Sequence, residues 1–100
     1  MSEERREAPR QPFLDEIMLE FSSGQREARI SDISTGGCYV DSIAAVSEGE
    51  TVTFELSTGD GSPLSFTGEV AYVLPAMGFG IKFTNLTDEQ RNFLLQVTNG

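Results

Sequence analysis

Apolar residues alternate with polar residues in six short segments of this 100-residue chain, and this alternation constrains the fold more than any other feature. Successive side chains of a β-strand point to opposite faces, so a period of two indicates a strand with one buried face. In the first segment, Ile17, Leu19 and Phe21 share one face. Met18 and Glu20 take the other. The pattern predicts a protein built mainly from half-buried strands.

Five further segments continue the alternation, and turn residues separate them. The segments are centred on residues 28–31, 38–40, 51–57, 64–72 and 79–83. The longest series comprises Leu64, Phe66, Gly68, Val70 and Tyr72, which we expect to share one face. Residues rich in Gly, Pro, Asp and Ser lie at 22–24, 32–37, 58–63 and 75–78, where they favour turns.

Helix signals occur only at the end of the chain. Thr87 is a good N-cap and Gln90 follows three residues later, as in a capping box. Asp88 and Glu89 favour the positive end of a helix dipole. The expected helix spans about residues 87–98, and its apolar face comprises Phe93, Leu94 and Val97. We expect an all-β fold with a terminal helix, namely a six-stranded antiparallel β-barrel plus a C-terminal α-helix.

The chain is expected to form one domain with an N-terminal arm. Residues 1–12 lack hydrophobic periodicity, and Pro9 and Pro12 discourage a helix, so we expect a flexible arm there. Residues 13–98 form the predicted barrel domain with its helix, and no internal repeat or second domain is visible.

Composition indicates a cytoplasmic protein without membrane insertion. Hydrophobic residues make up 38% and charged residues 23% of the chain, and no apolar run is long enough to span a bilayer. The charged N-terminus lacks the apolar stretch of a secretory signal. Cys38 is alone, which excludes an internal disulfide and a cysteine-built metal site.

Charge is distributed unevenly along the chain. The net charge of −9 argues against binding DNA or RNA, since that affinity depends on cationic side chains. Five of the seven basic residues lie in the first 31 positions: Arg5, Arg6, Arg10, Arg26 and Arg29. An acidic body with an arginine-bearing front end suits a small anion. The alternative is that Glu3, Glu4 and Glu7 neutralise the arm as a solvated mixture of charges.

Residues for catalysis are scarce, so no enzyme activity, catalytic residue or metal site is predicted. The chain has no His, which excludes Ser-His and Cys-His nucleophiles. Cys38 lies in a predicted strand, where we expect a small buried hydrophobe. Asp60 and Gly61 fit a turn and lack the further acids of a calcium loop.

The remaining candidate site combines the arm with one turn. Arg6 and Arg10 place two guanidinium groups four residues apart, and the stretch from Asp32 to Gly37 supplies a carboxylate, a hydroxyl and backbone amides. A guanidinium can donate two parallel bonds to a guanine edge or pair with a phosphate. A carboxylate can accept from guanine N–H groups. Ser34 and the amides of Gly36 and Gly37 can meet phosphate oxygens, and this glycine pair permits positive φ angles.

The order Arg6-x-x-x-Arg10 and Asp32-x-Ser34-x-x-Gly37 resembles the two-part signature of PilZ domains, bacterial receptors for cyclic di-GMP. The resemblance continues through residues 68–72 and 78–83 and covers the chain from about Arg5 to the C-terminal helix. It implies the same barrel and helix that the alternation predicts. The signature positions show no departure from the family pattern.

The resemblance also implies roles for these residues. Arg6 and Arg10 are expected to bind guanine edges and phosphates, Asp32 guanine N–H groups, and Ser34 a phosphate or base. Gly37 keeps the turn compact, and Arg5 either helps hold a second ligand molecule or is a spare exposed charge. The expected ligand is cyclic di-GMP, with no other cofactor.

We expect the chain to act through an unidentified downstream protein partner. The chain itself is expected to be a monomer or a ligand-linked dimer. The main alternative is a PilZ-like protein-interaction module that does not bind nucleotide. An enzyme acting on a nucleotide is a third class, without support from any acid/base or metal set.

Overall fold

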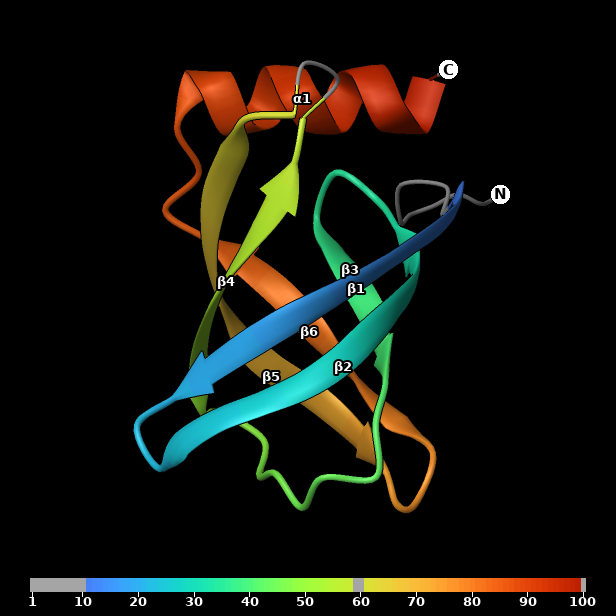
Figure 1. The fold of residues 1–100 in the computed structure, drawn as a ribbon, viewed down its shortest axis with the longest axis vertical. Helices are drawn as coiled ribbons and strands as arrows, with labels where there is room; N and C mark the ends of the chain where they lie inside the picture. The colour runs from blue at the N-terminus through green and yellow to red at the C-terminus, as the bar shows by residue number, and fades with distance from the viewer. Residues whose placement is uncertain (1–10, 59–60, 100) are drawn as a thin grey trace, which may run out of the picture.

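Six strands and one helix make up the computed structural model, which describes residues 11–58 and 61–99. The elements are β1 (Gln11–Phe21), β2 (Gly24–Ile33), β3 (Gly37–Asp41), β4 (Thr51–Ser57), β5 (Pro63–Leu74), β6 (Gly78–Thr84) and α1 (Asp88–Asn99). The prediction of an all-β fold with a terminal helix is confirmed (Figure 1).

The strands close into a barrel in the order β1-β2-β3-β6-β5-β4, and every neighbouring pair is antiparallel. Most neighbours are consecutive in the sequence. The exceptions are β3 with β6, and β1 with β4. The β3–β6 pairing brings residues 37–41 beside residues 78–82, which are far apart along the chain.

The core fills the barrel interior, and the predicted inward faces supply it. Cys38 is buried at 2% exposure, as expected for a small hydrophobe. The buried hydrophobic side chains are Ile17, Leu19, Phe21, Ile30, Ile33, Cys38, Val40, Val52, Phe54, Leu56, Phe66, Val70, Phe79, Ile81, Phe83, Phe93 and Leu94.

The capping box predicted for the helix is present. The amide of Gln90 donates to Thr87 Oγ1 at 3.1 Å, and the amide of Thr87 donates to Gln90 Oε1 at 2.6 Å. These reciprocal bonds satisfy two backbone donors at the start of the helix. Phe93 and Leu94 are buried and Val97 packs against the core, so α1 covers one end of the barrel (Figure 1). No helix in the described ranges is long and apolar enough to cross a membrane.

Strand boundaries on both sides of the candidate site differ from the prediction. β1 begins at Gln11, two residues before the expected start of the domain, and β2 continues to Ile33. Asp32 therefore lies within β2, one residue before its end, rather than opening a turn. Because antiparallel pairing with β1 and β3 continues to this point, the turn is reduced to residues 34–36.

The expectation that Tyr72 shares a face with Val70 is wrong. Val70 pairs with Ile81 and Tyr72 with Gly80, so Ala71 is an extra residue in β5. Such a bulge reverses the alternation beyond it. Val73 packs against the core, and Tyr72 lies on the outer face of the barrel, where it stacks with Tyr39.

Candidate functional site

The start of β1 and the end of β2 lie side by side, and this pairing positions the candidate site. Gln11 is the register partner of Ile33, and Pro12 is the partner of Asp32. In Figure 1, the beginning of β1 and the turn after β2 lie at the end of the barrel that carries α1. The arm residues Arg5, Arg6 and Arg10 lie outside the described residues.

A bulge at Ser31 directs Asp32 outward. Ile30 pairs with Val40 while Asp32 pairs with Tyr39, so Ser31 is unmatched. Ile30 and Ile33 are both fully buried, which strict alternation does not allow. Without the extra residue, Asp32 would point into the apolar core, where a carboxylate is costly. The bulge leaves Asp32 half-buried at the surface.

Ser34 organises the turn between β2 and β3. The backbone amides of Gly36 and Gly37 both donate to Ser34 Oγ at 3.2 Å, and the Ser34 amide donates to the Gly37 carbonyl at 2.8 Å. The Ser34 hydroxyl donates to the same carbonyl at 3.3 Å, and the residue is only 8% exposed. These groups thus bond one another, and their contact with a ligand phosphate stays a prediction.

The two glycines of the turn serve different purposes, and neither adopts the positive φ angle that glycine permits. A Cβ on Gly37 would lie 2.0 Å from the carbonyl oxygen of Ile81, so close packing against β6 requires glycine there. A Cβ on Gly36 would meet only Ser34 Oγ, at 4.0 Å. The Gly36 carbonyl accepts from the Phe83 amide at 2.9 Å, which ties the turn to β6.

A hollow of about 550 Å³ opens beside this turn and extends over β5 and β6. Lys82 is its one cation among the described residues, and it is the register partner of Gly37. The hollow is lined by Ser34, Thr35, Gly36, Gly37, Cys38, Ala71, Tyr72, Gly80, Ile81 and Lys82. The arrangement can accept a planar, anionic ligand, because it combines an aromatic face, a cation and a polar turn.

Two tyrosines cover the outer face of β6 next to the hollow. The rings of Tyr39 and Tyr72 stack with centroids 6.3 Å apart and planes 24° apart. They lie across Gly80, where a Cβ would come within 2.4 Å of the Tyr72 ring. Burial raises the pKa of the Tyr39 phenol, and electrostatic interactions with Asp41, the Tyr72 phenol and Asp32 raise it further. Tyr39 therefore keeps its O–H at neutral pH.

Asp32 lies beside the hollow rather than in it. It is the register partner of Tyr39, and its charge acts on the Tyr39 hydroxyl. The residues from Ser34 to Gly37 line the hollow directly. The structure thus brings the predicted residues Ser34 to Gly37 together at the hollow, and Asp32 lies two residues before Ser34, at its side.

Sequence reasoning about the site missed Lys82, Tyr39 and Tyr72. Tyr39 follows the turn in β3, whereas Lys82 and Tyr72 reach it through the pairings of β3 with β6 and of β6 with β5, which join residues distant in the sequence. The spacing of Gly78 and Gly80 was one available signal. Glycines on the outer face of a strand indicate that another group approaches closely, and here Tyr39 and Tyr72 do so.

A metal site has no support in the described part of the chain, where no group of three or more His, Cys, Asp or Glu side chains could hold an ion.

Two solved structures share this fold. The PilZ domain of CeSA from a cellulose-synthesizing bacterium aligns with a TM-score of 0.70 and 20% identity, covering 93% of this chain and 97% of that one. The Borreliella burgdorferi PlzA protein, in complex with c-di-GMP, aligns with a TM-score of 0.73 and 18% identity. This second alignment covers 95% of this chain and 41% of PlzA. No curated protein sequence matches the chain.

The family comparison covers almost the whole chain. The PilZ domain matches residues 4–100, a range that includes Arg5, Arg6 and Arg10 as well as the barrel and α1. The barrel of six antiparallel strands and the terminal helix agree with the PilZ structures. The chain therefore belongs to the PilZ domain family.

Proposed function

We propose that this chain is a bacterial cytoplasmic receptor for cyclic di-GMP and not an enzyme, with its ligand held between the arginine arm and the turn after β2. The observation that carries the proposal is the pairing of Gln11 with Ile33. This pairing fixes the point where the arm joins the barrel, and that point is adjacent to Asp32 and the turn.

The length of the arm fits this arrangement. Consecutive Cα atoms are about 3.8 Å apart, so the Arg10 backbone lies next to Gln11. Arg6 precedes Gln11 by five residues and can lie up to about 17 Å from it. Both guanidinium groups can therefore reach over the neighbouring hollow beside Gly37.

The chemistry of the site matches a guanine dinucleotide with two phosphates. Arg6 and Arg10 would donate to guanine O6 and N7 and to phosphate oxygens. Asp32 would accept from the guanine N–H groups. Lys82 supplies a further positive charge beside the turn, and the ring of Tyr72 offers a face for base stacking. Ser34 and Gly37 would hold the turn in shape for these contacts.

The signal would be relayed by the composite surface that forms when the ligand bridges the arm and the barrel. A partner protein that reads this surface would respond to the ligand without any chemical step. The c-di-GMP complex of PlzA supports the choice of ligand, because the alignment with that protein covers 95% of this chain.

Titration calorimetry with cyclic di-GMP tests the proposal. We expect the full chain to bind with a dissociation constant below about 100 μM. Each charge-assisted hydrogen bond contributes about 1.5–3 kcal/mol, so Asp32→Ala should weaken binding at least about tenfold. The double variant Arg6→Ala/Arg10→Ala should lose at least about a hundredfold.

Matched variants separate the site from general charge effects. Arg26→Ala removes an exposed arginine near the opposite end of β2 and should leave the affinity unchanged. Lys82→Gln should weaken binding about threefold to tenfold, as for a partly exposed charge. Equal affinities for all variants, or no binding by the wild type, would favour the interaction module instead. Two ligands per protein, reduced to one by Arg5→Ala, would assign Arg5 to a second ligand molecule.

A further inference from the structure

One edge of β1 has almost no partner strand. β1 pairs with β2 from Gln11 to Phe21, with one register shift between Pro12 and Asp15. On the other edge, Glu20 with Thr53 is the one register pair that joins β1 to β4 among the described residues. Figure 1 shows the two strands diverging from this point toward α1. An edge of this kind presents backbone N–H and C=O groups to another chain.

A hollow of about 400 Å³ follows the seam between β1 and β4. Met18, which is 43% exposed, lines it from β1, and Thr53 and Glu55 line it from β4. The buried side chains of Ile17 and Phe54 contribute to its lining. The seam therefore offers an apolar contact surface next to an open backbone edge.

The rim of this seam is acidic. Glu16, Glu20 and Glu55 line the hollow, and Glu20 accepts from Gln25 Nε2 at 2.9 Å and from Thr53 Oγ1 at 3.4 Å. A charged rim of one sign selects partners of the opposite sign.

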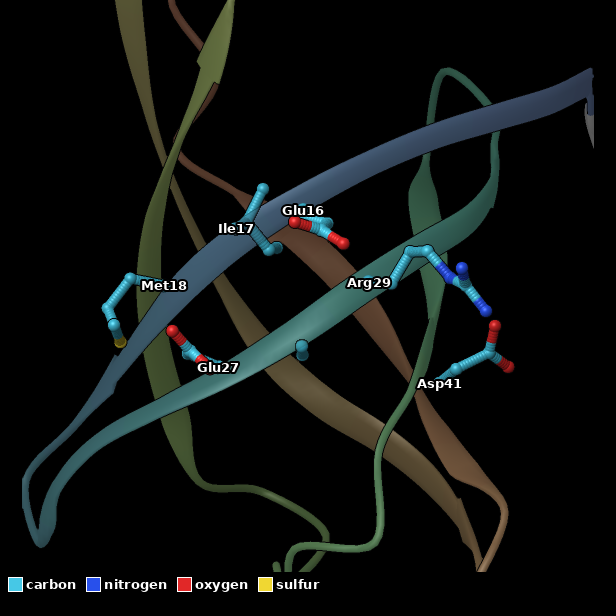
Figure 2. A pocket seen from close by; sticks show the side chains of 7 residues that line it. Glu16, Ile17, Met18, Glu27, Arg29 and Asp41 are labelled. Atoms are coloured by element: carbon cyan, nitrogen blue, oxygen red, sulfur yellow. The ribbon is translucent and has the colours of Figure 1, made fainter.

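A second hollow of about 520 Å³ continues the acidic surface across β1 and β2. It shares Glu16 and Met18 with the seam and adds Glu27. Its one cation among the described residues is Arg29, and Figure 2 shows this side chain extending toward Asp41 and away from Met18. The surface next to the seam thus keeps its negative charge.

We propose that this edge is a docking surface for an extended, basic segment of a partner protein. The segment adds a strand to β1 at residues 16–19, in the manner of β-strand addition. Its lysine or arginine side chains lie on the outer face, toward Glu16 and Glu55, and the apolar side chains that alternate with them point inward, toward Ile17 and Phe54. A second copy of the chain is a poor occupant, because the chain carries a net charge of −9. The proposal does not depend on nucleotide binding.

The test uses the full chain without nucleotide and a capped ten-residue peptide that alternates lysine and valine. We expect a dissociation constant below about 1 mM and slower amide hydrogen exchange at residues 16–19. A peptide alternating glutamate and valine should not bind. The lysine–valine peptide with N-methylated valines keeps its charge but loses backbone donors, so it should not protect these amides.

Paired charge variants locate the surface. Glu16→Gln/Glu55→Gln should weaken peptide binding about tenfold, from about threefold for each exposed charge. Glu48→Gln/Glu89→Gln makes the same charge change in a loop and in α1, and should alter the affinity less than twofold. Equal losses in both double variants, or undiminished binding of the N-methylated peptide, would overturn the proposal in favour of general electrostatic attraction.

Two further measurements test other occupants. In the full-length variant Arg5→Gln/Arg6→Gln/Arg10→Gln without peptide, amide exchange at residues 16–19 should match the wild type. Faster exchange there would show that the chain's own arm occupies the edge, and would overturn the partner assignment. Sedimentation of the wild type should show a monomer, and a dimer lost on substituting Met18→Glu would assign the edge to a second copy.

Discussion

At the turn after β2, contacts of single residues limit which side chains the turn can accept. Ser34 Oγ accepts from two consecutive glycine amides, and Gly37 sits against the Ile81 carbonyl. The glycines were predicted for their backbone flexibility, but steric contact across strands β3 and β6 accounts for Gly37. A local pattern cannot report such a contact, because the opposing atom comes from a distant strand.

Gly37→Ala should destabilise the fold, whereas Gly36→Ala should not. A Cβ at Gly37 would meet backbone 2.0 Å away, which cannot move aside as a flexible side chain can. We expect a loss of about 1–3 kcal/mol in the free energy of unfolding. The Cβ added in Gly36→Ala would meet only Ser34 Oγ, at 4.0 Å. The free energy of unfolding of this variant should therefore stay within about 0.5 kcal/mol of the wild type. Urea unfolding measures both, and equal stabilities would contradict the close packing described for Gly37.

We predict that the raised pKa of Tyr39 lowers the free energy of unfolding at alkaline pH. Burial and the charges of Asp41 and Asp32 raise the pKa of its phenol above 10.0, the value expected for the unfolded chain. As the pH rises past 10.0, the unfolded chain releases this proton while the folded protein retains it, so the free energy of unfolding falls. The contribution is present below pH 10.0 and is lost as the pH approaches the raised pKa.

Tyr39→Phe checks this assignment. The variant removes the titrating group, so the difference in unfolding free energy between wild type and variant should shift in favour of the variant above pH 10.0. Urea unfolding from pH 8 to pH 11 measures it. A difference that stays constant over this range would show that the Tyr39 pKa is the same in the folded and unfolded states.

At the scale of elements, the six strands and the helix could be predicted because their signals are local. Alternation placed residues such as Leu19 and Phe54 in the core, and turn residues separated the strands. The bulges at Ser31 and Ala71 could not be predicted from alternation, although they turn Asp32 and Tyr72 to the outer face. A bulge depends on the register with neighbouring strands, and one sequence does not show that register.

We predict that the capping box of α1 contributes measurably to the free energy of unfolding. Thr87→Ala removes the bond to the Gln90 amide and should cost about 1 kcal/mol. Gln96→Ala, at an exposed position in the same helix, should change the unfolding free energy by less than about 0.5 kcal/mol. Thermal and urea unfolding compare the two variants. If Thr87→Ala is no less stable than Gln96→Ala, the cap contributes nothing to holding α1 on the barrel.

On the scale of the whole molecule, the barrel separates two surfaces of different character. The turn after β2 and Lys82 lie on the side formed by β3, β5 and β6, and the open edge of β1 faces β4 across an acidic seam. The sequence predicted the turn residues of the first surface. It did not predict the acidic seam, because the seam depends on how β1 and β4 diverge after Glu20 and Thr53.

The central claim is that cyclic di-GMP binds at the turn between β2 and β3. The most direct measurement is an NMR titration of the 15N-labelled full chain with this ligand. We predict saturable shifts centred on the amides of residues 34–37, Tyr72 and Lys82, and much smaller shifts in Asp32→Ala at the same ligand concentration. No shifts at about 1 mM ligand, or shifts centred on residues 16–18 at the β1–β4 seam, would contradict the claim.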